Sequence, residues 1–330
     1  MRAPSVPLVH PVHRFAHHEI DFRRRIVTMA VVNRTPDSFY DDGAGAVLED
    51  ALAQAHAAAD AGAEWVDVGG LPFPPGAEPD PTEEAARVVP LIAALRSGDG
   101  AGSSEASRRL ILSADTFQPA VAEAALAAGA DVVNDTTGLF HADLGRVVAA
   151  AGAHLVVTHS LAHVRGPRAV VPRPTYGDVV REVRDHLRRT VDRAVALGVP
   201  EERIIVDPGH DLNKNTRHTL EITRRLDEIA TLGLPVLAAV SNKDFIGESL
   251  DRHRHERLPG SLAAAAACVY GGARILRMHD ADASVSAARM LECVFGWRQP
   301  ARLVHNMGAE NPPPDRSTLA GHRAHRGGRA

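Results

Sequence analysis

Cysteine is scarce in this chain, which has 330 residues but only Cys268 and Cys293. Both thiols lie in apolar, Ala-rich surroundings, so they cannot build a disulfide framework or a cysteine-based zinc site, and we expect buried free thiols. Long apolar runs are also missing, because no stretch approaches the roughly 20 residues that a membrane span needs. Residues 1–25 alternate histidine, proline and charge without the apolar centre of a signal sequence. We therefore expect a cytoplasmic protein.

A strong excess of charge of either sign is absent as well. The net charge of −4 gives no electrostatic reason to bind nucleic acid or a membrane surface. Hydrophobic residues make up 45% of the chain, which is normal for a protein that buries a core and excludes disorder of the whole chain. The expected partner is a small molecule.

Short β-branched apolar runs alternate with longer Ala- and Leu-rich amphipathic segments, a pattern typical of repeated βα units and a parallel sheet. The expected strands are Ile26–Val32, Trp65–Val68, Leu110–Ala114, Val132–Asn134, His154–Thr158, Ile204–Val206, Val236–Val240 and Ile275–Met278. The expected helices are Val47–Ala61, Thr82–Arg96, Pro119–Ala128, Ala142–Ala151, Asp178–Leu197, Thr216–Thr231, Leu262–Tyr270 and Ala283–Val294. Eight units in about 270 residues favour an α/β fold of the (β/α)₈ TIM barrel type. An open doubly wound sheet is the alternative on pattern alone.

The two ends of the chain differ in composition from the segment between them. We expect residues 1–25 to form a flexible N-terminal extension, residues 26–298 the barrel, and residues 299–330 a disordered tail. The extension contains His10, His13, His17 and His18. A metal site built from these histidines is a disfavoured alternative, because no scaffold or carboxylate partner is predicted beside them.

Polar residues stand at nearly every predicted strand end, where a (β/α)₈ barrel carries its chemistry. Each of them has a simpler explanation as a turn or helix-cap residue when taken alone. As a set, Asp115, Asn134, Asp207 and Lys243 place two carboxylates, an amide and an ammonium around one cavity, which suits a flat heterocycle with several donors and acceptors. Arg277 and His279 alternate along the last strand and, with the Asn33 amide, suit an anion such as a phosphate.

The motifs around these residues resemble the dihydropteroate synthase family. They fall in family order: Val32 to Phe39 (VNRTPDSF), Asp67 to Gly70 (DVGG) with Pro75 to Ala77, Ser113 to Thr116 (SADT), Asn134-Asp135, Asp207 to Gly209 (DPG), Ser241 to Lys243 (SNK) with Phe245 to Gly247, Gly260 to Ala264, and Arg277 to Asp280 (RMHD). The resemblance implies a pterin pocket made by Asp115, Asn134, Asp207 and Lys243. It places Asn33, Arg277 and His279 at a diphosphate, with Asn33 at its Mg²⁺ ion, and gives Lys243, Arg277 and His279 catalytic roles.

The implied reaction joins 6-hydroxymethyl-7,8-dihydropterin diphosphate to 4-aminobenzoate, releases diphosphate and yields dihydropteroate. It needs positioning and charge stabilisation but no covalent nucleophile. The resemblance also suggests a homodimer.

Two loops depart from the family pattern. Typical members follow the second strand with a Thr and an Arg that contact the diphosphate, whereas this chain has Leu71, Pro72, Phe73 and Pro74. The sixth-strand loop reads His210 to Lys214 (HDLNK) in place of a Gly- and Phe-containing run before its Lys, and we expect His210 and Asp211 to change the cavity floor or rim. These features are similar to the divergent second dihydropteroate synthase paralogue of actinobacteria.

The departures leave other functions open. One is a pterin-binding or regulatory protein with little or no synthase turnover. Another is a methyltetrahydrofolate-dependent methyltransferase on the same kind of barrel, which Arg277 and His279 disfavour because that chemistry has no diphosphate to hold.

Overall fold

Eight parallel strands close into a barrel in a computed structural model that describes residues 6–34, 44–71, 80–98, 102–167, 169–303 and 305. Around the barrel the order is β10-β3-β4-β5-β6-β7-β8-β9, so each strand pairs with its neighbours in sequence and the last pairs with the first. The strands are β3 (Val27–Asn33), β4 (Trp65–Gly69), β5 (Ile111–Asp115), β6 (Val132–Asp135), β7 (His154–Thr158), β8 (Ile204–Asp207), β9 (Val236–Ala238) and β10 (Ala273–Met278). The closed barrel confirms the predicted fold class and excludes the open sheet.

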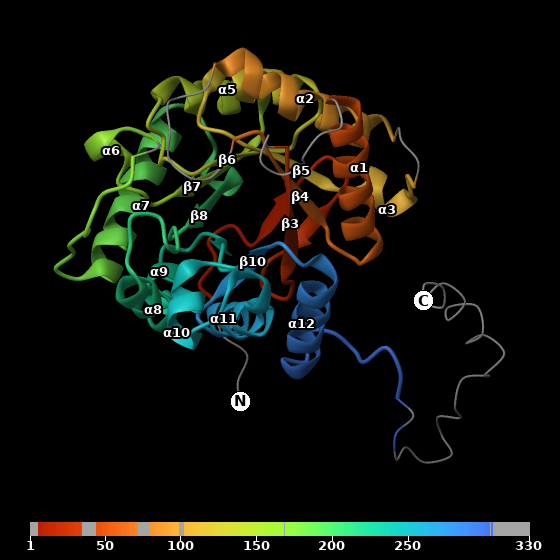
Figure 1. The fold of residues 1–330 in the computed structure, drawn as a ribbon. Coiled ribbons are helices and arrows are strands. Elements are labelled where there is room, and N and C mark those ends of the chain that lie inside the picture. Colours follow the sequence, from red (N-terminus) through yellow and green to blue (C-terminus); the bar gives the residue numbers. More distant parts are fainter. Residues whose placement is uncertain are drawn as a thin grey trace.

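Helices form the outer ring of the barrel (Figure 1). The longer ones are α1 (Ala44–Asp60), α2 (Pro81–Ser97), α4 (Pro119–Ala127), α5 (Ala142–Ala151), α7 (Val179–Ala196), α8 (Thr216–Arg224), α11 (Leu258–Tyr270) and α12 (Ala281–Val294). Shorter ones are α3 (Glu105–Arg108), α6 (Ala162–Arg165), α9 (Leu226–Ala230) and α10 (Asp244–Leu250), and the 3₁₀ turns η2 (Glu201–Arg203) and η3 (Arg254–Glu256) complete the set in the described residues. Proline opens α2 and α4, where its missing N–H costs nothing.

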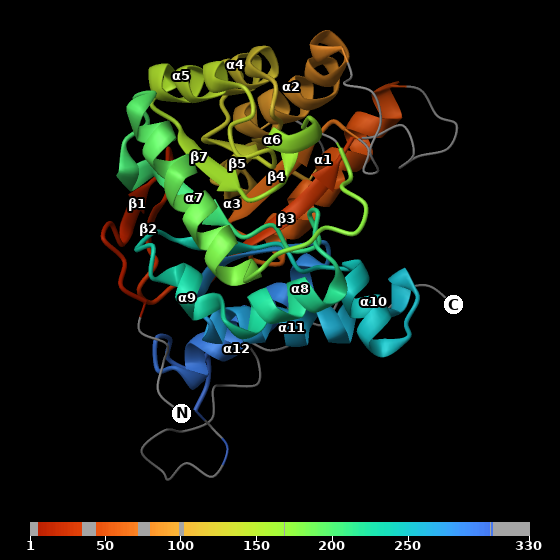
Figure 2. The same ribbon diagram turned by 90° about the vertical axis from the view of Figure 1, so that its left-hand side faces the viewer.

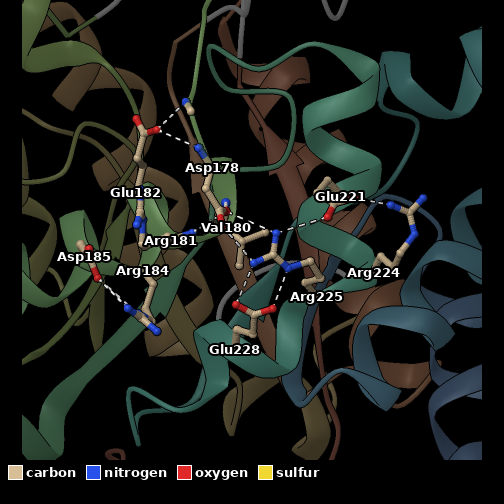
Figure 3. A network of polar contacts seen from close by, with 11 residues as sticks. Asp178, Val180, Arg181, Glu182, Arg184, Asp185, Glu221, Arg224, Arg225 and Glu228 are labelled. Carbon is tan, nitrogen blue, oxygen red and sulfur yellow. Dashed lines mark hydrogen bonds and ion pairs between the residues drawn. The ribbon is translucent and has the colours of Figure 1, made fainter.

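The single helix predicted at Thr216–Thr231 is two helices, α8 and α9, which meet at Arg225. The Arg225 guanidinium pairs with Glu228 at 2.6 Å, Asp178 at 3.2 Å and Glu221 at 3.3 Å, and Figure 3 shows these carboxylates converging on it. Asp178 also caps α7 by accepting the backbone N–H groups of Val180 and Arg181 at 3.1 Å each. The network therefore ties the start of α7 to the α8–α9 junction, although each partly exposed pair contributes little stability alone.

The N-terminal segment forms an antiparallel hairpin of β1 (Val12–Arg14) and β2 (Glu19–Asp21). Figure 2 shows this hairpin at one end of the barrel. Its contacts are with residues at the beginnings of barrel strands: the Phe15 ring lies 4.3 Å from the His154 ring and 5.7 Å from the Trp65 ring, between ring centroids. Phe22 is fully buried, and its carbonyl accepts a hydrogen bond of 2.9 Å from Nε of Arg274.

The expectation of a flexible N-terminal extension is thus wrong for residues 6–25, because this hairpin closes the N-terminal end of the barrel and its apolar side chains join the barrel core. His13 is buried between the rings of Phe22 and His154, at 5.2 and 5.4 Å. Burial lowers the pKa of His13 to about 4, so the ring is neutral. No cluster of histidine, cysteine or acidic side chains suited to a metal ion occurs in the described part of the chain, and the histidine metal site gains no support.

The two cysteines are free thiols as expected, although only Cys268 is buried and Cys293 is half-buried. Apart from residues 299–303 and 305, the predicted C-terminal tail lies outside the described residues. None of the described helices combines the length and apolar character that crossing a membrane would require.

Candidate functional site

The strand register sets four site positions at one level of the barrel mouth. Asn33 at the end of β3 pairs with Gly69 on β4, Gly69 pairs with Asp115 on β5, and Asp115 pairs with Asn134 on β6. Parallel strands end at the same side of the sheet, so this register collects three polar side chains, those of Asn33, Asp115 and Asn134, from three separate motifs. Asp207, at the end of β8, is paired with Thr158 on β7 and completes the other side of the ring.

Arg277 on β10 joins this ring through two ion pairs. Its Nε donates to Oδ2 of Asp67 at 2.7 Å, and its Nη2 donates to Oδ2 of Asp115 at 2.8 Å. Burial raises the pKa of Asp115, the Arg277 guanidinium opposes this rise, and the neighbouring carboxylates of Asp67, Glu84 and Asp135 add to it. The predicted pterin-binding carboxylate and the predicted diphosphate-binding guanidinium are therefore direct partners.

Asp67 accepts three hydrogen bonds from side chains. Besides Arg277, it accepts the Asn134 side-chain amide at 3.0 Å and the hydroxyl of Ser113. The Ser113 hydroxyl itself accepts the Trp65 indole N–H at 2.8 Å. On sequence grounds Asp67 was only the first residue of the DVGG motif, yet its alternation with Trp65 and Gly69 along β4 indicates the inward side of the barrel.

Asp207 and Lys243 form the opposite side of the site. Asp207 is 5% exposed, and its Oδ1 accepts the backbone N–H of Gly209 at 2.7 Å. Burial raises the pKa of Asp207, and the cations Lys243, Lys214 and Arg277 oppose the rise. The Lys243 ammonium has neither a hydrogen bond nor an ion pair with any described residue, and burial lowers its pKa while Asp211, Asp207 and Asp115 raise it. Its donors are available to a ligand.

Asn33 and His279 flank this ring. The Asn33 amide oxygen lies where a Cβ at Gly69 would approach within 2.7 Å, so glycine at that position leaves room for the amide. His279 Nδ1 lies 3.0 Å from the Ser241 hydroxyl, whose oxygen also accepts the His279 backbone N–H at 3.1 Å. Burial and the nearby cations Arg277, Arg254 and Lys243 lower the pKa of His279 to about 4, so the imidazole is neutral at pH 7.

The loop after β8 has a left-handed backbone at three positions, two of which are not glycine. Gly209, Asp211 and Asn213 all have positive φ angles, of 68°, 65° and 52°. Glycine adopts this left-handed conformation without strain, and Asp and Asn tolerate it better than other residues. Two positions whose backbone conformation suits glycine therefore carry polar side chains, those of Asp211 and Asn213, which can form hydrogen bonds with neighbouring residues.

The side chains of Asp211 and Asn213 both form hydrogen bonds with neighbouring segments. The Asp211 carboxylate accepts the Thr219 hydroxyl at 2.9 Å and the backbone N–H of Phe245, in the first turn of α10, at 3.2 Å. The Asn213 side chain accepts the backbone N–H of Val171 at 2.7 Å, and its backbone carbonyl accepts the Tyr176 hydroxyl at 3.0 Å. The loop is thus linked to α8, to α10 and to the segment that precedes α7.

His210, which we expected to change the cavity floor or rim, is not at the rim. It is fully buried, 3.9 Å from the Cys268 sulfur, and stacks against Phe245 at 6.4 Å. Burial lowers the pKa of His210 to about 3, which keeps the ring neutral. A neutral imidazole can replace an apolar side chain at this depth, whereas an imidazolium would require a buried counter-ion.

Lys214 is a buried residue that the sequence did not single out beyond its place in the motif. Its ammonium donates to the carbonyls of Gly209 at 2.8 Å and Leu212 at 3.0 Å, and it lies 2.9 Å from Nδ1 of His159. Burial lowers the pKa of Lys214 to about 7, and Asp207 and Asp211 oppose the fall. Lys214 therefore holds the turn that presents Asp207.

Comparison with known proteins agrees with this geometry. A family model described as "Pterin binding enzyme" matches residues 29–279. The chain belongs to this family. It is 42% identical over 287 residues to the "Inactive dihydropteroate synthase 2" of Mycobacterium leprae (strain TN), covering 86% of this chain and 95% of that protein. This similarity confirms the expected resemblance to a divergent second paralogue.

Proteins named as synthases are also similar. The "Dihydropteroate synthase" of Escherichia coli (strain K12) is 35% identical over 277 residues, which cover 83% of this chain and 93% of that protein. The solved Xanthomonas albilineans dihydropteroate synthase in complex with 7,8-dihydropteroate is 34% identical, with a TM-score of 0.74, and the match covers 86% of this chain and 98% of that one. The pterin-binding chain is therefore dihydropteroate synthase-like in sequence and in fold.

Proposed function

We propose that the barrel mouth binds 6-hydroxymethyl-7,8-dihydropterin diphosphate and condenses it with 4-aminobenzoate or a related arylamine, releasing diphosphate. The observation that carries this proposal is the ring of Asp115, Asn134, Asp207 and Lys243, which stand at the ends of neighbouring strands or just beyond them. Two carboxylates and an amide oxygen accept the N–H groups of a pterin, and the Lys243 ammonium donates to its ring nitrogen or carbonyl oxygen.

The diphosphate end of the substrate is assigned to Asn33, Arg277 and His279. Mg²⁺ usually takes few protein ligands and completes its octahedron with phosphate oxygens and water. A single amide oxygen at Asn33, with the room that Gly69 leaves beside it, fits such an ion better than a site built entirely from protein side chains would. When bound, Mg²⁺ neutralises charge on the diphosphate.

The reaction breaks the bond between the pterin methylene carbon and the diphosphate oxygen and forms a bond from that carbon to the arylamine nitrogen. Arg277 and His279 hold the departing diphosphate, whose growing negative charge is stabilised by the guanidinium. Asp115, Asp207 and Lys243 hold the pterin so that its methylene faces the second substrate. The arylamine nitrogen loses a proton to the departing diphosphate or to water after attack, and no side chain forms a covalent bond.

Release of diphosphate from the pterin substrate in the presence of 4-aminobenzoate tests the proposal. Purified protein is expected to release diphosphate and form dihydropteroate in equal amounts, and Lys243→Ala should abolish both. Pterin binding without any release would overturn the assignment of turnover and leave the assignment of the pterin site intact. Rescue of a synthase-deficient bacterial strain gives the corresponding result in cells.

A second function, pterin binding with little or no synthase activity, is favoured by specific observations. Mycobacterial proteins at 41–42% identity, including that of Mycobacterium tuberculosis (strain ATCC 25618 / H37Rv), carry the name "Inactive dihydropteroate synthase 2". In addition, Leu71 to Pro74 stand where typical members have the Thr and Arg of the diphosphate loop, and Pro72, Phe73 and Pro74 lie outside the described residues. Replacing Phe73-Pro74 with Thr-Arg should raise diphosphate release if this loop limits the rate. No gain would point to the loop after β8.

We further propose that the protein assembles as a homodimer and works in the cytoplasm, as the family resemblance suggests. Light scattering on the purified chain is expected to give twice the mass of one chain. Fractionation of cells that produce the protein is expected to recover it with the cytoplasmic enzymes.

A further inference from the structure

We propose that Asp67 is the positioning residue of this site: it fixes which atom of Asn134 meets the pterin and keeps Arg277 beside the diphosphate. The inference rests on the proposed function and adds a residue that does not itself contact the ligand. It starts from the burial of Asp67, whose side chain is 0% exposed although it is a carboxylate. A buried carboxylate is tolerated only where donors surround it.

Three donors reach Asp67, each from a different strand: Ser113 from β5, Asn134 from β6 and Arg277 from β10. The direction of the Ser113 bond is set by Trp65, because the indole can only donate and so occupies a lone pair of the hydroxyl oxygen. The hydroxyl hydrogen is then left for Asp67. All three donors therefore point at the carboxylate, and none can be reversed while Asp67 is ionised.

This arrangement determines the orientation of the Asn134 amide. A carboxylate only accepts, so the amide must turn its nitrogen to Asp67 and its oxygen away. That oxygen is buried and has no hydrogen-bond partner among the described residues. A buried acceptor of this kind selects a ligand with an N–H group at the same place and disfavours analogues that present an acceptor there.

The two carboxylates that bind Arg277, those of Asp67 and Asp115, differ in exposure. The bond from Nε reaches Asp67, whose side chain is 0% exposed, whereas the bond from Nη2 reaches Asp115, whose side chain is 24% exposed. A pterin that takes Asp115 as its acceptor competes with Nη2 but not with Nε. Arg277 can therefore release Asp115 to the pterin while Asp67 holds the guanidinium at the site, within reach of the diphosphate.

The test compares two probes, 6-hydroxymethylpterin and its diphosphate, on Asp67→Asn and on the exchanged double variant Asp67→Asn/Asn134→Asp. In Asp67→Asn one carboxylate oxygen becomes an NH₂ group, which opposes either the Ser113 hydroxyl or the Asn134 and Arg277 donors. In both orientations the Asn134 amide loses its charged acceptor, so we expect the pterin affinity to fall about 10- to 100-fold by calorimetry, as for loss of a hydrogen bond to a charged group. The double variant restores an amide–carboxylate pair with an acceptor facing the ligand. Its affinity for 6-hydroxymethylpterin should be at least tenfold higher than that of Asp67→Asn. The double variant should still lack the additional affinity that wild type has for the diphosphate over 6-hydroxymethylpterin, because the charge opposite Nε of Arg277 is lost.

Asp131→Asn is the matched control. Asp131 precedes β6 with its side chain only 7% exposed, and its oxygens bind Arg96 at 2.6 Å and the Leu112 backbone N–H at 2.9 Å, away from the strand ends. This variant is expected to melt at a lower temperature and to bind both probes like wild type.

The proposal is overturned if Asp67→Asn keeps both affinities within twofold, or if the exchange restores both probes equally. If Asp67→Asn does not fold, Ser113→Ala frees one side of the same carboxylate and should weaken the pterin probe about threefold or more; unchanged affinity there overturns the proposal as well. Wild-type protein that binds neither probe overturns the proposed function together with this inference, whereas wild-type binding with insensitive Asp67 variants overturns the inference alone.

Discussion

Asp207→Asn tests the pterin site most directly. Asp207 is buried at the end of β8, and one of its oxygens is occupied by the Gly209 N–H at 2.7 Å. An asparagine can keep that bond with its own oxygen, so the turn is preserved. The other oxygen becomes an NH₂ group, and a charged acceptor for the pterin's guanidine-like edge is replaced by a donor.

The expected loss follows from the charge on Asp207. Hydrogen bonds to charged groups contribute about 1.5–3 kcal/mol net, and about 1.4 kcal/mol corresponds to a tenfold change in Kd. We therefore expect Asp207→Asn to weaken 6-hydroxymethylpterin binding about 10- to 100-fold. The effect should be larger than for an exposed carboxylate, because water does not compete at this depth.

Isothermal titration calorimetry at two pH values measures the effect. Burial raises the pKa of Asp207 above its usual value of 3.8, so the wild-type affinity should begin to fall at a higher pH than that value as the carboxylate becomes protonated. The variant lacks this group and should show a smaller fall. Unchanged affinity at neutral pH would refute the pterin assignment of Asp207.

The control for this experiment lies at the opposite end of the barrel. Asp131 precedes β6, and its carboxylate pairs with Arg96 at 2.6 Å and accepts the Leu112 backbone N–H at 2.9 Å. Asp131→Asn removes the same charge from a position remote from the strand ends. It should lower the stability without changing the pterin affinity, and a similar loss of affinity in both variants would mean that charge alone, not position, matters.

Three further outcomes are expected. Phe22→Ala, which empties a fully buried site under the N-terminal hairpin, should lower the free energy of unfolding by about 3–5 kcal/mol in urea titrations; a change below 1 kcal/mol would contradict the role of the hairpin. Asn213→Gly keeps the left-handed backbone but removes the side-chain bond to Val171, so hydrogen exchange at the Val171 amide should accelerate, and unchanged exchange would show that the bond is not formed in solution. Lys214 has a pKa of about 7 in the folded chain and an ordinary value of 10.5, so between these pH values the unfolded chain binds more protons and the free energy of unfolding rises with pH. Lys214→Met should show a smaller rise in the free energy of unfolding from pH 7 to 10.5. An equal rise would refute the assigned pKa.

The barrel strands were predictable because they are buried on both faces and read as continuous β-branched runs. The break at Arg225 was not, since Arg225 pairs there with Asp178, which is distant in sequence. The N-terminal hairpin was missed for a related reason. Strands of three residues, such as Val12–Arg14, are too short to show alternation, and Phe15 is buried by residues far along the chain.

The positions of the candidate site residues at or just beyond the strand ends were predictable, but the pairing of their side chains was not. Alternation correctly brings Arg277 to the inner face of β10. Whether its guanidinium meets a ligand or another side chain depends on the successive registers of β10 with β3, β3 with β4 and β4 with β5, which no local pattern records. The two bonds of Arg277 to Asp67 and Asp115 are the result of that register.

The site thus divides into two parts with different tolerance for change. Asp115, Asn134 and Asp207 stand on strands whose backbone positions are fixed by the barrel ladder. Asp211 and Asn213 stand on a loop that keeps a glycine-like path while adding side-chain links to Thr219 and Val171. Substitution in such a loop can slow any motion that brings the arylamine to the pterin methylene while the pterin contacts stay as they are. Strand-end variants should therefore act on pterin affinity, and loop variants on the rate of diphosphate release.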